Sequence, residues 1–410
     1  MARICVIRQG VFPLDARLTR EIAALGAAGH EVDLVCQSWP GQPKEERSGT
    51  LTIHRLPFER RRKAIGKLRY LVEYGSFLVG AAVAVAGLHL RRRFDVVQVN
   101  SLPDCLVFAA IVPKLLGARV LLDLMECMPE FFMTKYRMSP DRLVVKMLMT
   151  CEQASIAFAD HVITCTQPMR ERFIERGARP EKIDVILNSY DEDRVDPRRY
   201  PASANAGDKF VLICHGTIDW MYGLDLVVGA VSRLKDRIRG LRLLIYGDGP
   251  LRASVESLAE ERGVRDLVWF SESWRPMEEL LSAIASADAG VIAIRRDACF
   301  DLTHSNKMYD LVAMEKPIVI SRTRAVESYF GDDCFQLFES GNEDDLTRAI
   351  YELYTDPERR ARLARRASAI GEPYRWVHQR AHYLDIIARL IDAAASVPAT
   401  AVVAGPAEER

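Results

Sequence analysis

Short apolar runs alternate with helical patterns at the start of the chain. The run Ile4–Arg8 is rich in β-branched residues, and Leu18, Ile22 and Leu25 then recur at helical spacing. A second apolar run follows at Glu31–Cys36. Runs rich in β-branched residues are typical of buried strands, and apolar positions three and four apart are typical of helices. The pattern predicts a strand, a helix and a second strand, closed by a turn at Gly29.

The same alternation continues to residue 165 and starts again at residue 210. The first half predicts further strands at Asp95–Val99, Arg119–Leu124 and His161–Cys165, with helices at Asp104–Leu116 and Arg142–Phe158. The second half predicts strands at Phe210–Gly216, Leu241–Gly247, Leu267–Phe270, Ala289–Ile294, Pro317–Ser321 and Cys334–Phe338. Strands separated by helices imply parallel sheets covered on both faces. We therefore predict an α/β protein with two doubly wound, Rossmann-like domains facing each other across a cleft.

The polar segment 191–208 separates the two alternations and is rich in Asp, Arg, Pro, Ser and Ala. It has no apolar periodicity, so we place the domain linker there. The predicted domains are residues 1–190 and 209–370, in a chain of 410 residues. A last helical pattern covers 374–392, and the residues after it are weakly patterned.

Composition narrows the function classes. Lys plus Arg and Asp plus Glu both number 56, so no overall field attracts nucleic acid. The nine cysteines include no CxxC pair, which favours buried thiols in a reducing cytoplasm. His378 and His382 are four residues apart, but no acid lies between them and no third ligand is evident, so we expect no metal site. The N-terminal strand lacks the apolar core of a secretory signal, which also favours a cytoplasmic protein.

The segment 70–90 is long and apolar, and basic residues flank it on both sides. A membrane span needs about 20 apolar residues, so that alternative stays open. Glu73, three glycines and the strand pattern that follows favour a helix packed in the core. Peripheral contact of the basic flanks with the inner face of a membrane is a further alternative.

Candidate chemistry lies in loops at the carboxyl ends of the predicted strands, where doubly wound domains bind ligands. Ser305 or Asn306 can cap a helix whose free amides face an anion, and Lys307 lies beside them. Asp310, one turn later, can accept hydrogen bonds from sugar hydroxyls. Together these residues outline a site for a phosphorylated sugar compound, although an exposed Lys and Asp pair is the alternative.

Three other loops carry glycines or carboxylates. Gly216 ends one predicted strand and Gly223 begins the next helix, and these glycines would let a diphosphate approach the backbone. Gly247 lies in the loop Tyr246–Arg252, which partly resembles a dinucleotide fingerprint, and a tight turn is the alternative. Asp123 and Glu126 cluster with Glu130 at a third strand end, where carboxylates can face the cleft or cap a helix. The chain has no P-loop, no serine nucleophile elbow and no basic-aromatic array for nucleic acid.

Several segments together resemble the retaining glycosyltransferases of family 4, which have the GT-B fold. They are Gly29–Val35, Asp123–Tyr136, Ala159–Thr166, His215–Leu226, Tyr246–Pro250 and Ser305–Val319. The resemblance covers most of residues 1–390. It implies that the C-terminal domain binds a nucleotide-diphosphate sugar without a cofactor or metal, that the N-terminal domain binds an acceptor, and that the helix at 374–392 crosses back onto the first domain.

The resemblance also implies roles for individual residues. Asp310 matches the acid that holds the ribose, Lys307 a basic residue near the diphosphate, and Gly216 and Thr217 the phosphate loop. Gly10 matches a loop that closes over the donor, and Ser273 and Trp274 fall where the base is held. Glu126 and Asp123 would line the sugar side, and we expect them to act in catalysis with Lys307.

Two residues depart from the family pattern. Met125 stands where a histidine usually faces the donor sugar, and Met221 stands where a basic residue usually offsets the leaving diphosphate. A thioether cannot donate a strong hydrogen bond or stabilise charge. We expect a glycosyltransferase for carbohydrate biosynthesis, acting on a nucleotide sugar and an anionic or lipid-linked acceptor. The alternatives are a catalytically altered paralogue that serves as a scaffold, and a sugar-nucleotide epimerase or hydrolase.

Overall fold

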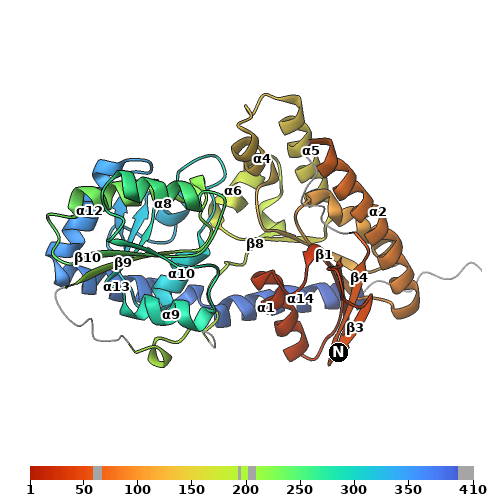
Figure 1. Cartoon of the computed structure of the whole chain (residues 1–410). Helices are drawn as coiled ribbons and strands as arrows, with labels where there is room; N and C mark the ends of the chain where they lie inside the picture. The colour runs from red at the N-terminus through yellow and green to blue at the C-terminus, as the bar shows by residue number, and fades with distance from the viewer. Residues whose placement is uncertain (59–66, 193–194, 202–208, 396–410) are drawn as a thin grey trace, which may run out of the picture.

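The computed structural model describes residues 1–58, 67–192, 195–201 and 209–395. It contains two α/β domains, each built on one sheet, and the sheets lie side by side with helices on both of their faces (Figure 1). This architecture confirms the predicted fold class.

The first sheet has the strand order β3-β4-β2-β1-β5-β6-β7-β8. All neighbouring strands are parallel except β3 and β4, which form an antiparallel pair at one edge. The strands are β1 (Arg3–Val11), β2 (Glu31–Gln37), β3 (Glu45–Ser48), β4 (Leu51–Leu56), β5 (Val96–Asn100), β6 (Arg119–Leu124), β7 (His161–Thr164) and β8 (Ile183–Val185).

Helices cover both faces of the first sheet. They are α1 (Ala16–Ala27), α2 (Lys67–Arg92), the 3₁₀ helix η1 (Asp104–Ala110), α3 (Ile111–Leu115), α4 (Met128–Tyr136), α5 (Leu143–Phe158), α6 (Gln167–Glu175) and η2 (Pro180–Lys182). In α1, the predicted positions Leu18, Ile22 and Leu25 are all buried against the sheet. Asp15 caps this helix by accepting hydrogen bonds from the amides of Arg17 and Leu18.

The second sheet has the order β11-β10-β9-β12-β13-β14, and all of its neighbouring strands are parallel. The strands are β9 (Phe210–His215), β10 (Leu241–Tyr246), β11 (Val268–Phe270), β12 (Ala289–Ile292), β13 (Ile318–Ser321) and β14 (Gln336–Phe338). The remaining helices are η3 (Pro197–Arg199), η4 (Trp220–Tyr222), α7 (Leu224–Leu234), α8 (Arg252–Glu261), α9 (Met277–Ser286), α10 (Asn306–Ala313), α11 (Arg324–Glu327), α12 (Glu343–Thr355), α13 (Pro357–Gly371), η5 (Glu372–Tyr374) and α14 (Trp376–Ala395).

The last helix, α14, joins the two halves. It runs from the boundary between the domains along the first domain and packs against α1, β5 and β6 (Figure 1). Tyr383 is fully buried there, and its hydroxyl donates a 2.6 Å hydrogen bond to the side chain of Gln98. The helix α14 therefore forms part of the core of the N-terminal domain.

The apolar segment 70–90 lies within α2, and the expectation of a core helix describes only one of its faces. Phe77, Ala81 and Val85 are fully buried on the sheet, but only 22% of the span Val72–Arg92 is buried. This span is the one helix of the described residues that is long and apolar enough to cross a membrane by length and composition.

Candidate active site

A cavity of about 880 Å³ lies between the two domains, at the carboxyl ends of several strands. Residues that follow β6 and those of α4 form its first wall, and the loops after β9, β10 and β12 form the second. It brings together most of the residues singled out in the sequence: Met125, Glu126, Gly216, Thr217, Met221, Gly247, Trp274, Ser305, Asn306, Lys307 and Asp310.

Lys307 is half-buried in the second wall. It lies in the first turn of α10, and its Nζ is 3.3 Å from the centre of the Tyr222 ring. Burial lowers the pKa of Lys307 to about 8. The ammonium group is thus held by an aromatic face in a site with little water, which is a favourable setting for attracting an anion.

Glycines allow the backbone to close around this lysine. Gly216 has φ +101°, and a Cβ on it would collide with the Lys307 side chain. Gly247 has φ +149°, and a Cβ there would collide with the carbonyl group of Gly216. Both positions therefore require glycine, and together they bring two strand-end loops into contact beside the cavity.

Asp310 is also in the second wall and has a partner that the sequence reasoning missed. Nε2 of His215 lies 3.2 Å from Oδ2 of Asp310. His215 is buried at the end of β9 and lines the cavity, directly before Gly216. The sequence signal that could have identified His215 as a site residue is its position at the end of a strand, next to the predicted phosphate loop. The contact orients the Asp310 carboxylate toward the cavity.

Ser305 precedes α10 and occupies its N-cap position, but its side chain makes no capping hydrogen bond. The helix begins where expected, but the predicted capping hydrogen bond from the Ser305 side chain is not formed. Asn306 is the first residue of α10 and lines the cavity, so the free backbone amides at the start of this helix lie close to the cavity.

Met221 lines the cavity without a charge, and Arg295, from the loop after β12, contacts its backbone. The backbone amide of Arg295 donates to the Met221 carbonyl at 2.8 Å. Its guanidinium donates to Asp225 at 2.9 and 2.6 Å and to the Trp220 carbonyl at 2.7 Å. The positive charge beside Met221 is therefore already neutralised within the protein.

The first wall contains the carboxyl group of Glu126. Burial raises the pKa of Glu126, while Arg8 and Lys135 lower it less strongly. Its Oε2 is buried and has no hydrogen-bond partner among the residues that the structure describes. A buried carboxyl group with a free oxygen can accept or donate a proton at a bound hydroxyl.

Asp123 does not face the cavity. It is fully buried, and both of its oxygens accept from Arg17, at 2.9 and 3.0 Å. Arg17 also donates to the Ile186 carbonyl at 2.7 Å and to the side chain of Asn188 at 2.9 Å, and Asn188 lines the cavity. Asp123 thus supports the cavity wall through Arg17, and sequence reasoning missed this because Arg17 is far away in the chain.

Gly10 and Ser273 lie outside the cavity lining. Gly10 is within β1 and not after it, and Ser273 is exposed. Trp274, next to Ser273, lines the rim of the cavity and is 60% exposed. Phe131, Thr134 and Lys135 of α4 line the first wall, although the sequence analysis did not single them out.

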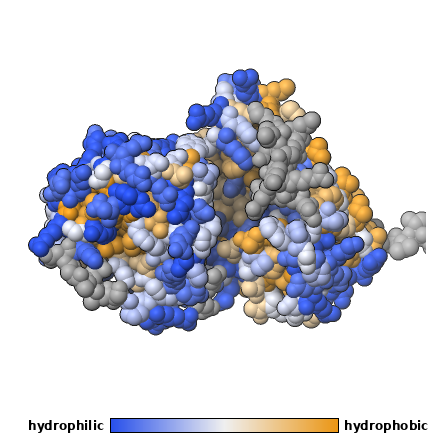
Figure 2. Space-filling view, viewed as in Figure 1, coloured by the Kyte–Doolittle hydropathy of each residue, from blue (hydrophilic) through white to orange (hydrophobic). Residues whose placement is uncertain are grey.

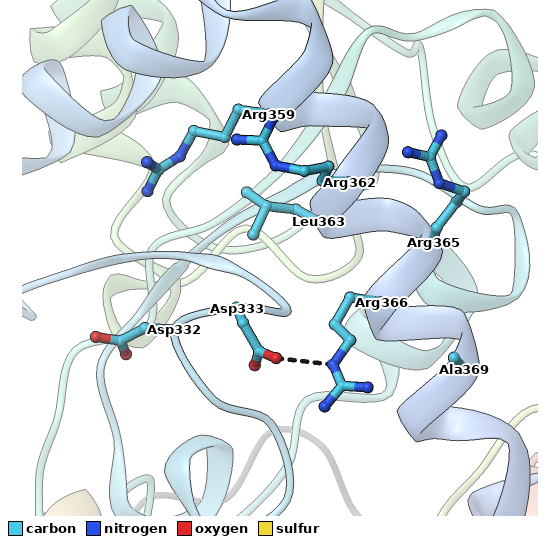
Figure 3. Close-up of a pocket in the computed structure, with 8 residues that line it drawn as sticks. All are labelled: Asp332, Asp333, Arg359, Arg362, Leu363, Arg365, Arg366 and Ala369. Atoms are coloured by element: carbon cyan, nitrogen blue, oxygen red, sulfur yellow. Dashed lines mark hydrogen bonds and ion pairs between the residues drawn. The ribbon is translucent and has the colours of Figure 1, made fainter.

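A second hollow, of about 580 Å³, lies on the outer side of the C-terminal domain (Figure 3). Arginines of α13 extend over it, and Arg366 pairs with Asp333 at 2.7 Å. It contains none of the predicted site residues. In the described part of the chain, no three His, Cys, Asp or Glu side chains are grouped to hold a metal ion.

Comparison with known proteins identifies the family of each of the two domains. Residues 15–189 match the model of the glycosyl transferase 4-like domain, and residues 209–356 match the model of glycosyl transferases group 1. The two matched ranges coincide with the two domains that the sheets define.

Sequence relatives act on several substrates. The chain is 26% identical to the GDP-mannose-dependent alpha-(1-6)-phosphatidylinositol monomannoside mannosyltransferase of Mycolicibacterium smegmatis over 50% of this chain and 56% of that one. It is 23% identical to the putative colanic acid biosynthesis glycosyl transferase WcaI of Escherichia coli, over 72% and 76%. The match to the D-inositol 3-phosphate glycosyltransferase of Corynebacterium kroppenstedtii, at 25% identity, spans 58% of this chain and 54% of that one. The chain thus aligns with about half the length of two of these relatives.

Solved structures share the whole fold. The sucrose-phosphate synthase of Thermosynechococcus elongatus superposes with a TM-score of 0.75 at 18% identity, covering 96% of this chain and 100% of that one. HepE of Anabaena, solved in complex with UDP, superposes with a TM-score of 0.68 at 14% identity, covering 95% and 100%. With the two domain matches, these likenesses identify the chain as a member of the glycosyltransferases with family 4-like domains and the GT-B fold.

Proposed function

We propose that the protein transfers a sugar from a nucleotide-diphosphate donor to an acceptor, with retention at the anomeric carbon and without a metal ion. The observation that carries the proposal is the second wall of the cavity, where Lys307 and Asp310 lie on one short helix beside Gly216 and Gly247. This wall combines a half-buried cation, a carboxylate and close backbone approach, which are the features that a nucleotide diphosphate requires.

In this proposal, each residue of the second wall acts on a different part of the donor. The Lys307 ammonium and the amides near Asn306 stabilise the diphosphate as it leaves, and Asp310, oriented by His215, accepts hydrogen bonds from the ribose hydroxyls. Trp274 offers an exposed aromatic face for the base at the rim.

The first wall would hold the sugar and the acceptor. Glu126, with its raised pKa and free oxygen, is placed to accept the proton of an acceptor hydroxyl. Lys135 also lines this wall, which favours an anionic or lipid-linked acceptor. Retention is supported by the resemblance to retaining enzymes of family 4.

A second candidate is a binding or scaffold protein that keeps the nucleotide pocket. The specific observation in its favour is the pair Met125 and Met221, which line the cavity where charged or hydrogen-bonding groups would serve catalysis. Hydrolysis or epimerisation of the donor is a third candidate, because an altered centre can redirect the same leaving group.

The test is a product assay with GDP-mannose and UDP-glucose as donors, and with inositol phosphate and a lipid extract as acceptors. We expect a glycosylated product. Free sugar released without an acceptor would indicate hydrolysis, and an isomerised nucleotide sugar would indicate an epimerase. Nucleotide binding without any product would indicate the scaffold.

Met125→His separates a weakened enzyme from a scaffold. A hydrogen-bond donor near the reacting centre is worth about two powers of ten in rate, so this variant of a weakened enzyme should transfer at least about tenfold faster. Met138→His, a half-buried methionine outside the cavity lining, is the matched control. An unchanged rate in Met125→His, with normal nucleotide binding, would contradict the view that Met125 weakens an ordinary transferase.

A further inference from the structure

The outer face of α2 exposes a row of apolar side chains. Val72, Val79, Val83 and Leu90 are 64%, 65%, 71% and 69% exposed. Their spacing of seven, four and seven residues places them on one side of the helix, opposite the buried Phe77, Ala81 and Val85. Figure 2 shows this hydrophobic surface along the outer edge of the N-terminal domain.

Neighbouring helices extend this surface. The helix α3, which packs against α2, exposes Ile111, Leu115 and Leu116. Leu143, Val144 and Met147 are exposed on α5, and both α5 and α2 pack against η1. We call the exposed apolar side chains of α2, α3 and α5 the apolar face. Large apolar side chains exposed in this number are typical of an interaction site.

Basic residues border the apolar face. Arg91 and Arg93 are exposed at the end of α2, and Arg142 and Lys146 are exposed at the start of α5. Between Gly75 and Leu90 the α2 sequence has no Asp or Glu, and the one acidic residue of α5, Glu152, is fully buried. An apolar centre with positive edges matches a lipid surface with anionic headgroups.

We propose that the apolar face docks the protein on the surface of an anionic lipid bilayer. The helix α2 lies flat on the bilayer and does not span it, because Phe77, Ala81 and Val85 are part of the core of the first domain. A second copy of the chain is the less suitable occupant, because self-association through this face would bring its positive edges together. The proposal does not depend on sugar transfer.

The experiment is co-sedimentation of the full chain with vesicles of phosphatidylcholine and phosphatidylglycerol, compared with vesicles of phosphatidylcholine alone. The wild type should sediment with the anionic vesicles, and less so as salt is raised. Val79→Glu combined with Val83→Glu should lower its partition coefficient at least about tenfold, because two valines are then lost from the lipid contact. Val377→Glu, at a half-exposed valine of α14, is the matched control and should sediment as the wild type does.

A second variant checks the charged edges while leaving the apolar face intact. Arg91→Gln combined with Lys146→Gln should weaken sedimentation with anionic vesicles and remove part of its salt dependence. Thermal melting of each variant verifies that it is folded. The proposal is overturned if the wild type stays in solution with both kinds of vesicle, or if the double glutamate variant sediments unchanged. It is also overturned if light scattering shows a dimer that the glutamates dissociate and that does not bind vesicles.

Discussion

Lys307 is a half-buried lysine whose ammonium group faces an aromatic ring. Burial lowers its pKa to about 8, so it is mostly charged at neutral pH and loses its charge as the pH rises above 8. An anion bound beside it would favour the charged form and raise that pKa again. Nucleotide binding and protonation of Lys307 are therefore linked.

This linkage predicts a pH profile. The affinity for GDP or UDP should be steady up to about pH 8 and then fall, by up to about tenfold per pH unit, because the free protein must take up a proton to bind. Lys307→Met should bind about ten- to a hundredfold more weakly and lose this dependence. Calorimetric titration between about pH 6.5 and about pH 9.5 measures both effects. Lys235→Met, at an exposed lysine, is the control, and a similar pH profile in the Lys307 and Lys235 variants would refute the role of Lys307.

Individual partners in the site were harder to predict than the residues themselves. The sequence places Asp123 at a strand end, but its burial depends on Arg17, which approaches from α1, 106 residues away in the chain. Such a pairing follows from how α1 packs on the sheet, and no local pattern encodes it. Met125, Lys307 and Asp310 all line the cavity. Met125 directly follows β6, and Lys307 and Asp310 lie in the first two turns of α10, so local pattern was sufficient to place them at strand and helix ends.

At the scale of elements, the strand-helix alternation was sufficient to predict the sheets. The strands β3, β4 and β8 were not predicted. In β3 all four residues are polar and exposed, so it has no apolar pattern to reveal it. The character of α2 was predicted only in part. Its sequence is apolar all round, so periodicity alone did not distinguish its buried face from its exposed one.

The contact between the loops after β9 and β10 can be tested at Gly247. Gly247→Ala would place a Cβ against the Gly216 carbonyl in addition to the cost of its positive φ. Gly29→Ala, where φ is +81° and the space is open, carries only the backbone cost, about 1 to 2 kcal/mol. We expect Gly247→Ala to lower the free energy of unfolding by at least about 2 kcal/mol more than Gly29→Ala. Equal losses in denaturant titrations would show that the two loops are not tightly packed.

At the scale of the whole molecule, the cavity lies between the two sheet domains, and α14 connects these domains. The helix α14 follows the second domain in the chain and packs on the first, so it connects the domains that form the two walls of the cavity. The apolar face lies on the first domain, whose helix α4 both lines the cavity and packs against α5. A bilayer docked on that face would therefore lie on the acceptor side of the cavity.

The central claim is that the cavity between the domains binds a nucleotide diphosphate through its second wall. The direct measurement is calorimetric titration of the chain with GDP and UDP, in the wild type and in Asp310→Ala. The account predicts binding of at least one nucleotide at one site per chain. It also predicts a loss of about tenfold in Asp310→Ala, because the ribose then loses a charge-assisted hydrogen bond. No binding of either nucleotide, or equal affinity in the two proteins, would contradict it.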